Sequence, residues 1–146
     1  MSAVPGNLPE AVAAVLCASA MEEVPSGESL TVAAAGMTWA ARAWGSPKDD
    51  PVLLVHGTMS DAGVFWRLAP ALAAAGHRVF AIDMPAHGET GPWRGRYAIA
   101  DTAADLAALI RSLDIDADTV SVLGHSWGGM VVAGLSIAGI RPRNVL

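Results

Sequence analysis

Residues 124–129 read GHSWGG and place Ser126 between a glycine two positions before it and another two positions after it. A serine in a Gly-x-Ser-x-Gly sequence is typical of a nucleophile that attacks a carbonyl carbon. The apolar run 119–124 predicts a buried strand that leads into this motif, and the small residues of 126–139 predict a helix that follows it. A serine at such a junction lies on a sharp turn with its hydroxyl exposed. The motif favours acyl transfer at Ser126, and an idle serine in a glycine-rich turn is the alternative.

Strands and helices alternate around this serine. Continuous apolar runs indicate strands buried on both faces, as in a parallel sheet, at residues 52–57, 77–83 and 119–124. Helical patterns lie between them at 64–76, which ends at Gly76, and at 100–115, with Asp101 as the candidate N-cap. This order predicts an α/β fold in which a mostly parallel sheet is flanked by helices and the crossovers are right-handed.

The segments outside these runs predict shorter elements. Residues 28–45 indicate two strands joined by a turn, and residues 143–146 indicate the start of another strand. Residues 8–24 are expected to form a short helix between two prolines. We divide the chain into a leader with this helix, 1–29, and one α/β domain, 30–146.

Three segments, with the spacing between them, resemble the N-terminal half of the α/β-hydrolase fold superfamily: LLVHGTMSDAGVFW (53–66), VFAIDMPAHGETG (79–91) and VLGHSWGGM (122–130). The resemblance implies an α/β-hydrolase fold truncated after the nucleophile helix, with Ser126 as the nucleophile. It also implies an oxyanion hole formed by the backbone N–H groups of Thr58 and Trp127. Supporting positions are expected at His56, Gly57, Gly124 and Gly128.

The four histidines receive different interpretations. His56 is expected to order the oxyanion loop rather than to transfer a proton, and His87 is expected to be a structural hydrogen-bonding residue. His125 precedes Ser126 and is expected to point away from it, which makes it a poor base. His77 is expected on the surface at the start of a strand, with no assigned chemistry.

The residue at the nucleophile position bears on the reaction. Dehalogenases and epoxide hydrolases, which resemble this chain and read G-H-D-W-G-G, have an aspartate where this chain has Ser126. Serine favours an acyl-enzyme over an alkyl-enzyme ester, so the resemblance implies a small-molecule substrate with an acyl group, such as a carboxylic ester, thioester or lactone. Trp127 is either a packing residue or a wall of the substrate pocket.

A serine nucleophile needs a base, and the base needs a carboxylate that orients it. Residues 127–146 contain no Asp, Glu or His. We therefore expect this chain to be the N-terminal portion of a longer hydrolase and to be catalytically incomplete by itself. Two alternatives are a non-catalytic binding protein that keeps the pocket, and a protein completed by a partner chain.

Composition excludes several other classes of function. The net charge is −5 and no basic patch occurs, so nucleic acid is not an expected partner. No apolar run reaches the roughly 18 residues of a membrane span. One cysteine in the chain excludes an internal disulfide and fits a cytoplasmic protein. No metal or cofactor motif occurs, and the apolar sheet edge at 143–146 is expected to favour self-association.

Overall fold

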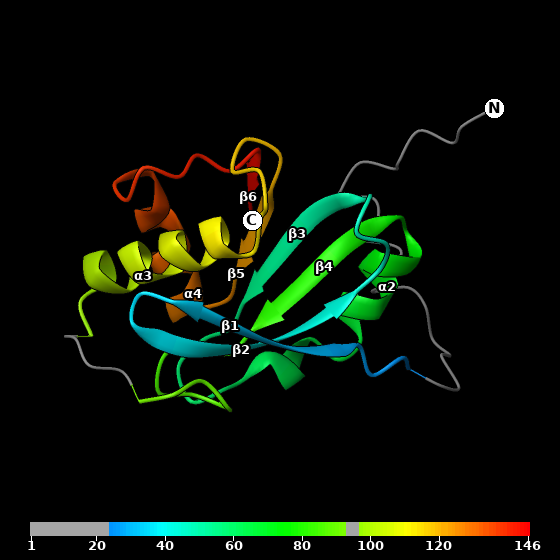
Figure 1. Ribbon diagram of the computed structural model, residues 1–146, viewed down its shortest axis with the longest axis horizontal. Helices are drawn as coiled ribbons and strands as arrows, with labels where there is room; N and C mark the ends of the chain where they lie inside the picture. Colours follow the sequence, from blue (N-terminus) through cyan, green and yellow to red (C-terminus); the bar gives the residue numbers. More distant parts are fainter. Residues whose placement is uncertain (1–23, 93–96) are drawn as a thin grey trace.

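The computed structural model describes residues 24–92 and 97–146 (Figure 1). Its strands form one sheet in the order β1-β2-β4-β3-β5-β6. They are Glu28–Ala34 (β1), Met37–Trp44 (β2), Asp50–Val55 (β3), His77–Ile82 (β4), Ser121–Gly124 (β5) and Asn144–Val145 (β6). Three of the five strand pairings are parallel, and the two that involve β2 are antiparallel. The predicted sheet is therefore confirmed as a mixed sheet that is mainly parallel.

Helices cover both faces of this sheet (Figure 1). One face packs against α2 (Leu68–Ala74), which follows the short 3-10 helix η1 (Ala62–Phe65). The other face packs against α3 (Ile99–Ser112) and α4 (Trp127–Ala133), and the 3-10 helix η2 (Gly134–Ser136) follows α4. Alternate residues of β3 divide between the two cores, because successive side chains of a strand point to opposite faces.

The helix predicted at 64–76 is divided in the structure. Its first part belongs to η1, and α2 begins only at Leu68. Pro70 has no N–H to donate, so it fits an α-helix only in the first turn, which is where α2 places it. Gly76 follows the helix with φ of 90° and provides the expected stop.

The prediction that Asp101 caps its helix is wrong. The helix α3 begins at Ile99, Ala98 is the N-cap residue, and no side chain caps the helix. Asp101 lies in the first turn instead, where a carboxylate interacts favourably with the helix dipole.

The helix after Ser126 is also shorter than predicted, since α4 ends at Ala133 and continues as η2. A β-carbon on Gly134 would lie 3.0 Å from Cβ of Ala103. This glycine therefore permits close contact between η2 and α3. The helix predicted at 8–24 falls almost entirely outside the described residues, so it and the division at residue 29 stay predictions.

The prediction that His77 lies on the surface is also wrong. This histidine is 7% exposed, and neither of its ring nitrogens has a hydrogen-bond partner within the part of the chain that the structure describes. The prediction of a surface position failed because β4 lies inside the sheet, between β2 and β3. The carbonyl of His77 also lies against Gly45.

Candidate active site

Ser126 stands between the end of β5 and the first residue of α4. Its φ of 55° and ψ of −121° lie in a region that residues with side chains rarely adopt, at a typical cost of about 1–3 kcal/mol. Serine is a favoured N-cap residue, yet the Ser126 side chain makes no capping hydrogen bond to α4. The residue is exposed, so the strained turn presents a hydroxyl that the helix does not use.

Two glycines make this turn possible. A β-carbon on Gly124 would lie 2.6 Å from Cα of Gly129. A β-carbon on Gly128 would collide with the carbonyl oxygens of Val55 and His56 at the end of β3. The turn therefore has room only for glycine at both positions, and α4 approaches the sheet closely at Gly128.

The loop that follows β3 packs directly against the serine. A β-carbon on Gly57 would lie 3.0 Å from Cβ of Ser126. The next residue, Thr58, is exposed, and within the described ranges its N–H donates no backbone hydrogen bond. As the first residue of α4, Trp127 has an N–H with no helical carbonyl to receive it. The structure thus brings two N–H groups without backbone partners to the side of the sheet where Ser126 lies.

His56 connects this loop to the one after β4. The side chain is fully buried, its Nδ1–H donates to the Gly57 carbonyl at 2.7 Å, and its Nε2 accepts from the Met84 N–H at 2.9 Å. These two bonds assign the neutral tautomer with the proton on Nδ1. Burial lowers the pKa of His56, and the hydrogen bond to the Gly57 carbonyl opposes that shift only in part. This geometry fits a residue that orders the loop.

Asp83 is a functional candidate that the sequence interpretation missed. The carboxylate is buried, Oδ1 accepts from the Ala62 N–H at 2.7 Å, and Oδ2 accepts from the Glu89 N–H at 2.8 Å. Gly88 lies directly against the same carboxylate. Asp83 therefore joins the β3 loop to the β4 loop. The signal in the sequence was an aspartate that directly ends an apolar strand.

The other two histidines near the serine differ in their contacts. His87 is a hydrogen-bonding residue as predicted, since Nε2 accepts from the Met59 N–H at 3.2 Å. His125 is exposed, and Nδ1 lies 3.2 Å from the position of a β-carbon on Gly57, which Ser126 also contacts. The expected orientation of His125 away from Ser126, and its expected weakness as a base, stay predictions.

The Trp127 ring is half-buried and lies in a row of rings beside the serine. The ring centroid is 6.3 Å from that of His87, in a stacked arrangement, and 6.5 Å from that of Tyr97. Tyr97 is 62% exposed and Met59 is 94% exposed. Trp127 therefore packs against neighbouring rings, and its expected role as a wall of the substrate pocket stays a prediction.

The described residues contain no candidate metal site. No group of three or more His, Cys, Asp or Glu suited to a metal occurs in 24–92 and 97–146.

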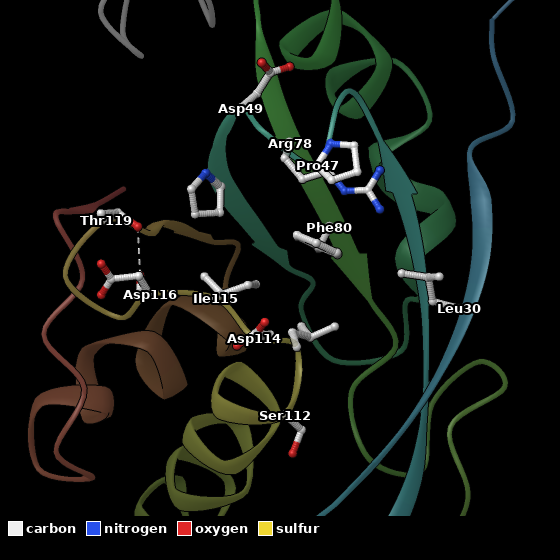
Figure 2. Close-up of a pocket in the computed structure, with 12 residues that line it drawn as sticks. Leu30, Pro47, Asp49, Arg78, Phe80, Ser112, Asp114, Ile115, Asp116 and Thr119 are labelled. Carbon is white, nitrogen blue, oxygen red and sulfur yellow. Dashed lines mark hydrogen bonds between the residues drawn. The ribbon is translucent and has the colours of Figure 1, made fainter.

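A cavity of about 470 Å³ lies between the end of α3 and the amino ends of β3 and β4, with Pro51, Arg78 and Leu113 in its lining (Figure 2). Ser126 follows the carboxyl end of β5, so this cavity is at the opposite edge of the sheet. No helix of the described chain has the length and apolar character to cross a membrane.

Comparison with known proteins gives a consistent family. A family model described as alpha/beta hydrolase fold matches residues 50–138, more than half of the chain. A haloalkane dehalogenase of Psychrobacter cryohalolentis is 32% identical over 99 residues, which are 66% of this chain and 31% of the relative. A probable serine hydrolase of Drosophila melanogaster is 34% identical over 107 residues, 71% of this chain and 31% of the relative.

A solved structure agrees with these sequence relatives. The thioesterase domain from the curacin biosynthetic pathway has a TM-score of 0.72 at 25% identity, and the match covers 83% of this chain and 45% of that domain. The chain thus spans less than half of the length of each of these three proteins.

Proposed function

The chain belongs to the alpha/beta hydrolase fold family, and we propose that it is the nucleophile-bearing part of a serine hydrolase. The substrate is a small molecule with a carboxylic ester, thioester or lactone group, and the reaction proceeds through an acyl-enzyme on Ser126. The observation that carries this proposal is the strained turn, which holds Ser126 at φ of 55° with its hydroxyl unused by the helix.

In the proposed reaction, Oγ of Ser126 attacks the carbonyl carbon and its proton passes to a base. The carbonyl oxygen becomes an oxyanion, to which the N–H groups of Thr58 and Trp127 donate hydrogen bonds. The oxyanion then re-forms the carbonyl and expels the alcohol or thiol, which takes a proton from the protonated base. Water, activated by the same base, releases the acid and regenerates the serine. Removal of one oxyanion donor typically lowers the rate about 10²–10³-fold.

Two of the three relatives have names that fit acyl transfer, and the third does not. The names serine hydrolase and thioesterase fit the proposal. The dehalogenase name belongs to a different reaction, but this chain has serine at the position where the dehalogenases resembling it have aspartate. Serine forms acyl-enzymes with carbonyl substrates, so we favour an ester or thioester over a halide.

The base and its orienting carboxylate are not assigned in this chain, because no Asp, Glu or His follows Ser126. We expect the chain to become acylated slowly and to turn over slowly or not at all. A cytoplasmic location also stays a prediction, supported by the single cysteine.

The test is the reaction of the chain with p-nitrophenyl acetate. Mass spectrometry of the digested protein is expected to find the acetyl group on Ser126, and Ser126→Ala is expected to remove it. Ser136→Ala is the matched control, because Ser136 is an exposed serine after α4 and its loss is expected to change nothing. Acetylation that is independent of Ser126 contradicts the proposed nucleophile. Ser126-dependent turnover at ordinary enzyme rates contradicts the expected lack of a base.

The alternative is a non-catalytic or partner-completed protein of the same fold. One observation favours completion by another chain: within the described sheet, β6 pairs only with β5 and leaves its other side open. A stable complex of fixed stoichiometry that hydrolyses the ester supports this alternative, and tight ligand binding without acylation supports a binding protein.

A further inference from the structure

Met59, in the loop after β3, has a left-handed backbone conformation that contacts of its side chain do not stabilise. Its φ is 60°, in the left-handed region that non-glycine residues adopt infrequently. The side chain is 94% exposed, so packing contributes little to fixing this conformation. What does hold the residue is its N–H, which donates to Nε2 of His87 at 3.2 Å.

The accepting nitrogen of His87 is set by the other side of the ring. Nδ1 lies 3.0 Å from the Pro85 carbonyl, and a carbonyl only accepts, so Nδ1 carries the proton. In a neutral imidazole Nε2 is then free to accept from Met59. His87 supports the loop only as this neutral tautomer.

The proposed oxyanion loop, residues 57–59, is therefore held by two imidazoles, one at the end of β3 and one in the loop after β4. His56 donates to the Gly57 carbonyl at 2.7 Å, and His87 accepts from the Met59 N–H at 3.2 Å. Thr58 lies between these two anchored residues, and its N–H is the first proposed oxyanion donor. The position of that N–H depends on both neighbouring peptide units.

His87 also contacts the residue that carries the second proposed donor. Its ring stacks on Trp127 with centroids 6.3 Å apart and an angle of 29° between the planes. One side chain thus contacts both parts of the proposed oxyanion hole, through a hydrogen bond on one side and a ring face on the other.

We propose that neutral His87 is the positioning residue of the oxyanion hole, and that its protonation releases the loop at Met59. This inference rests on the proposed function, since it assigns Thr58 and Trp127 as oxyanion donors. Protonation adds a hydrogen to Nε2, so that two N–H groups face each other and the hydrogen bond is lost. The strained Met59 then loses this support, and the Thr58 N–H leaves its position.

Other titratable groups lie on the elements packed around His87. His56 contacts its ring edge at 5.3 Å between centroids, and burial favours the neutral form of His56. The carboxylate of Asp83 accepts from two backbone N–H groups, and that of Asp61 accepts from the Gly63 N–H. Two further groups of the described residues are the exposed Glu89 of the same loop and Tyr97 across Trp127.

The first test needs no catalysis. Long-range ¹H–¹⁵N spectra of the full chain are expected to show His87 as the neutral Nδ1–H tautomer at pH 8. The Met59 amide resonance is expected to shift as pH falls, in parallel with the protonation of His87. A Met59 amide that does not change while His87 becomes protonated overturns the proposal.

Two variants separate the hydrogen bond from the ring contact. The side chain introduced by His87→Gln reaches the Nε2 position with a carbonyl oxygen that accepts but does not titrate. The variant His87→Phe instead keeps a ring face toward Trp127 and removes the acceptor. Each is compared with the wild type for the rate of Ser126 acylation by p-nitrophenyl acetate. At pH 8 we expect at least roughly a tenfold loss for His87→Phe and less than about a threefold loss for His87→Gln, since the loss of one oxyanion donor costs about 10²–10³-fold.

Dividing the acylation rate of a variant by the wild-type rate at the same pH separates the effect of His87 from the general effect of pH on the reactivity of serine. The rate of His87→Gln relative to wild type is expected to rise as pH falls from 8 to 5, because only the wild type loses its support. A constant ratio, or equal losses for His87→Phe and His87→Gln at pH 8, overturns the proposal. Glu89→Gln is the matched control, because it removes an exposed titratable side chain of the same loop as His87 and keeps the backbone N–H that Asp83 accepts from, so its ratio to wild type is expected to stay constant.

The two proposals fail in different ways. If wild-type Ser126 is not acylated at all, the proposed function fails, and the Met59 amide shift still decides whether His87 holds the loop. If Ser126 is acylated and the Met59 amide does not respond to His87, only the positioning role fails.

Discussion

Gly57 lies against Ser126 so closely that a β-carbon on the glycine would be 3.0 Å from Cβ of the serine. The two residues come from different strands, because Gly57 follows β3 and Ser126 follows β5. These strands are parallel neighbours in the sheet, with Val55 paired to Gly124. The contact therefore places the proposed oxyanion loop beside the proposed nucleophile.

Gly57→Ala is expected to lower the rate of Ser126 acylation by p-nitrophenyl acetate at least roughly tenfold, part of the effect of losing an oxyanion donor. The added methyl group forces apart the loop and the serine, and its other near neighbours are Nδ1 and the carbonyl oxygen of His125, both at 3.2 Å. Gly91→Ala is the control, because the nearest atom to its β-carbon is the Thr38 carbonyl oxygen at 3.8 Å. Equal rates for the two variants contradict a close functional contact between Gly57 and Ser126.

The stability of the folded chain is expected to fall as pH decreases below about 6.5, the unfolded value for histidine. Burial lowers the pKa of His56 in the folded state, so the unfolded chain binds the proton more readily. Stability is therefore full above the unfolded pKa and declines until the pH reaches the lowered pKa of the folded state. Urea unfolding between pH 8 and pH 5 measures this slope.

Two variants, His56→Gln and His125→Gln, test whether His56 causes the change of the unfolding free energy with pH. His56→Gln is expected to be less stable than the wild type at pH 8 and to have a shallower slope, since its buried group does not titrate. His125→Gln is expected to keep the wild-type slope because His125 is exposed. An unchanged slope in His56→Gln is incompatible with the assigned cause.

Asp83→Asn is expected to lower the free energy of unfolding by about 1.5–3 kcal/mol, the usual range for a hydrogen bond to a charged group. The carboxylate accepts from Ala62 and from Glu89, whereas an amide presents an NH₂ group to one of these donors. Urea unfolding measures the change. Asp61→Asn is the control: it accepts from the exposed Gly63 N–H, and asparagine caps equally well, so a change within about 0.5 kcal/mol is expected.

The open edge of β6 is expected to cause self-association. Within the described sheet β6 pairs only with β5, and Val145 and Leu146 are 54% and 47% exposed. Exposed strand edges with apolar side chains associate readily, and a lysine opposes this. Val145→Lys is therefore expected to reduce the average mass measured by sedimentation velocity at high protein concentration. An unchanged distribution of masses shows that association, if present, uses another surface.

Much of the fold was accessible from sequence because its signals are local. The apolar runs at 52–57 and 77–83 predicted β3 and β4, since strands buried on both faces leave few polar residues. The same reasoning failed for His77, because burial of a polar residue depends on which strands become its neighbours. That information is in the strand order, which no local pattern of residues contains.

The candidate site was predictable in the turn at Ser126 and only in part in its supports, since the supporting roles of His56 and His87 were expected but their partners were not. Ser126 and its glycines form one short motif whose geometry requires those residue types. Asp83 and His87 act through hydrogen bonds to Ala62 and Met59, which belong to another loop. A sequence shows that such polar residues are present, but their partners are defined only when the β3 and β4 loops meet.

The strand order also determines when the serine turn can form during folding. The strands β1 and β2 are consecutive and pair with each other, so this hairpin needs only local chain closure. The Val55–Gly124 pairing instead joins distant parts of the chain, across β4 and α3, and contacts of this kind form slowly. We therefore expect the strain at Ser126 to be imposed late in folding, when β5 docks beside β3.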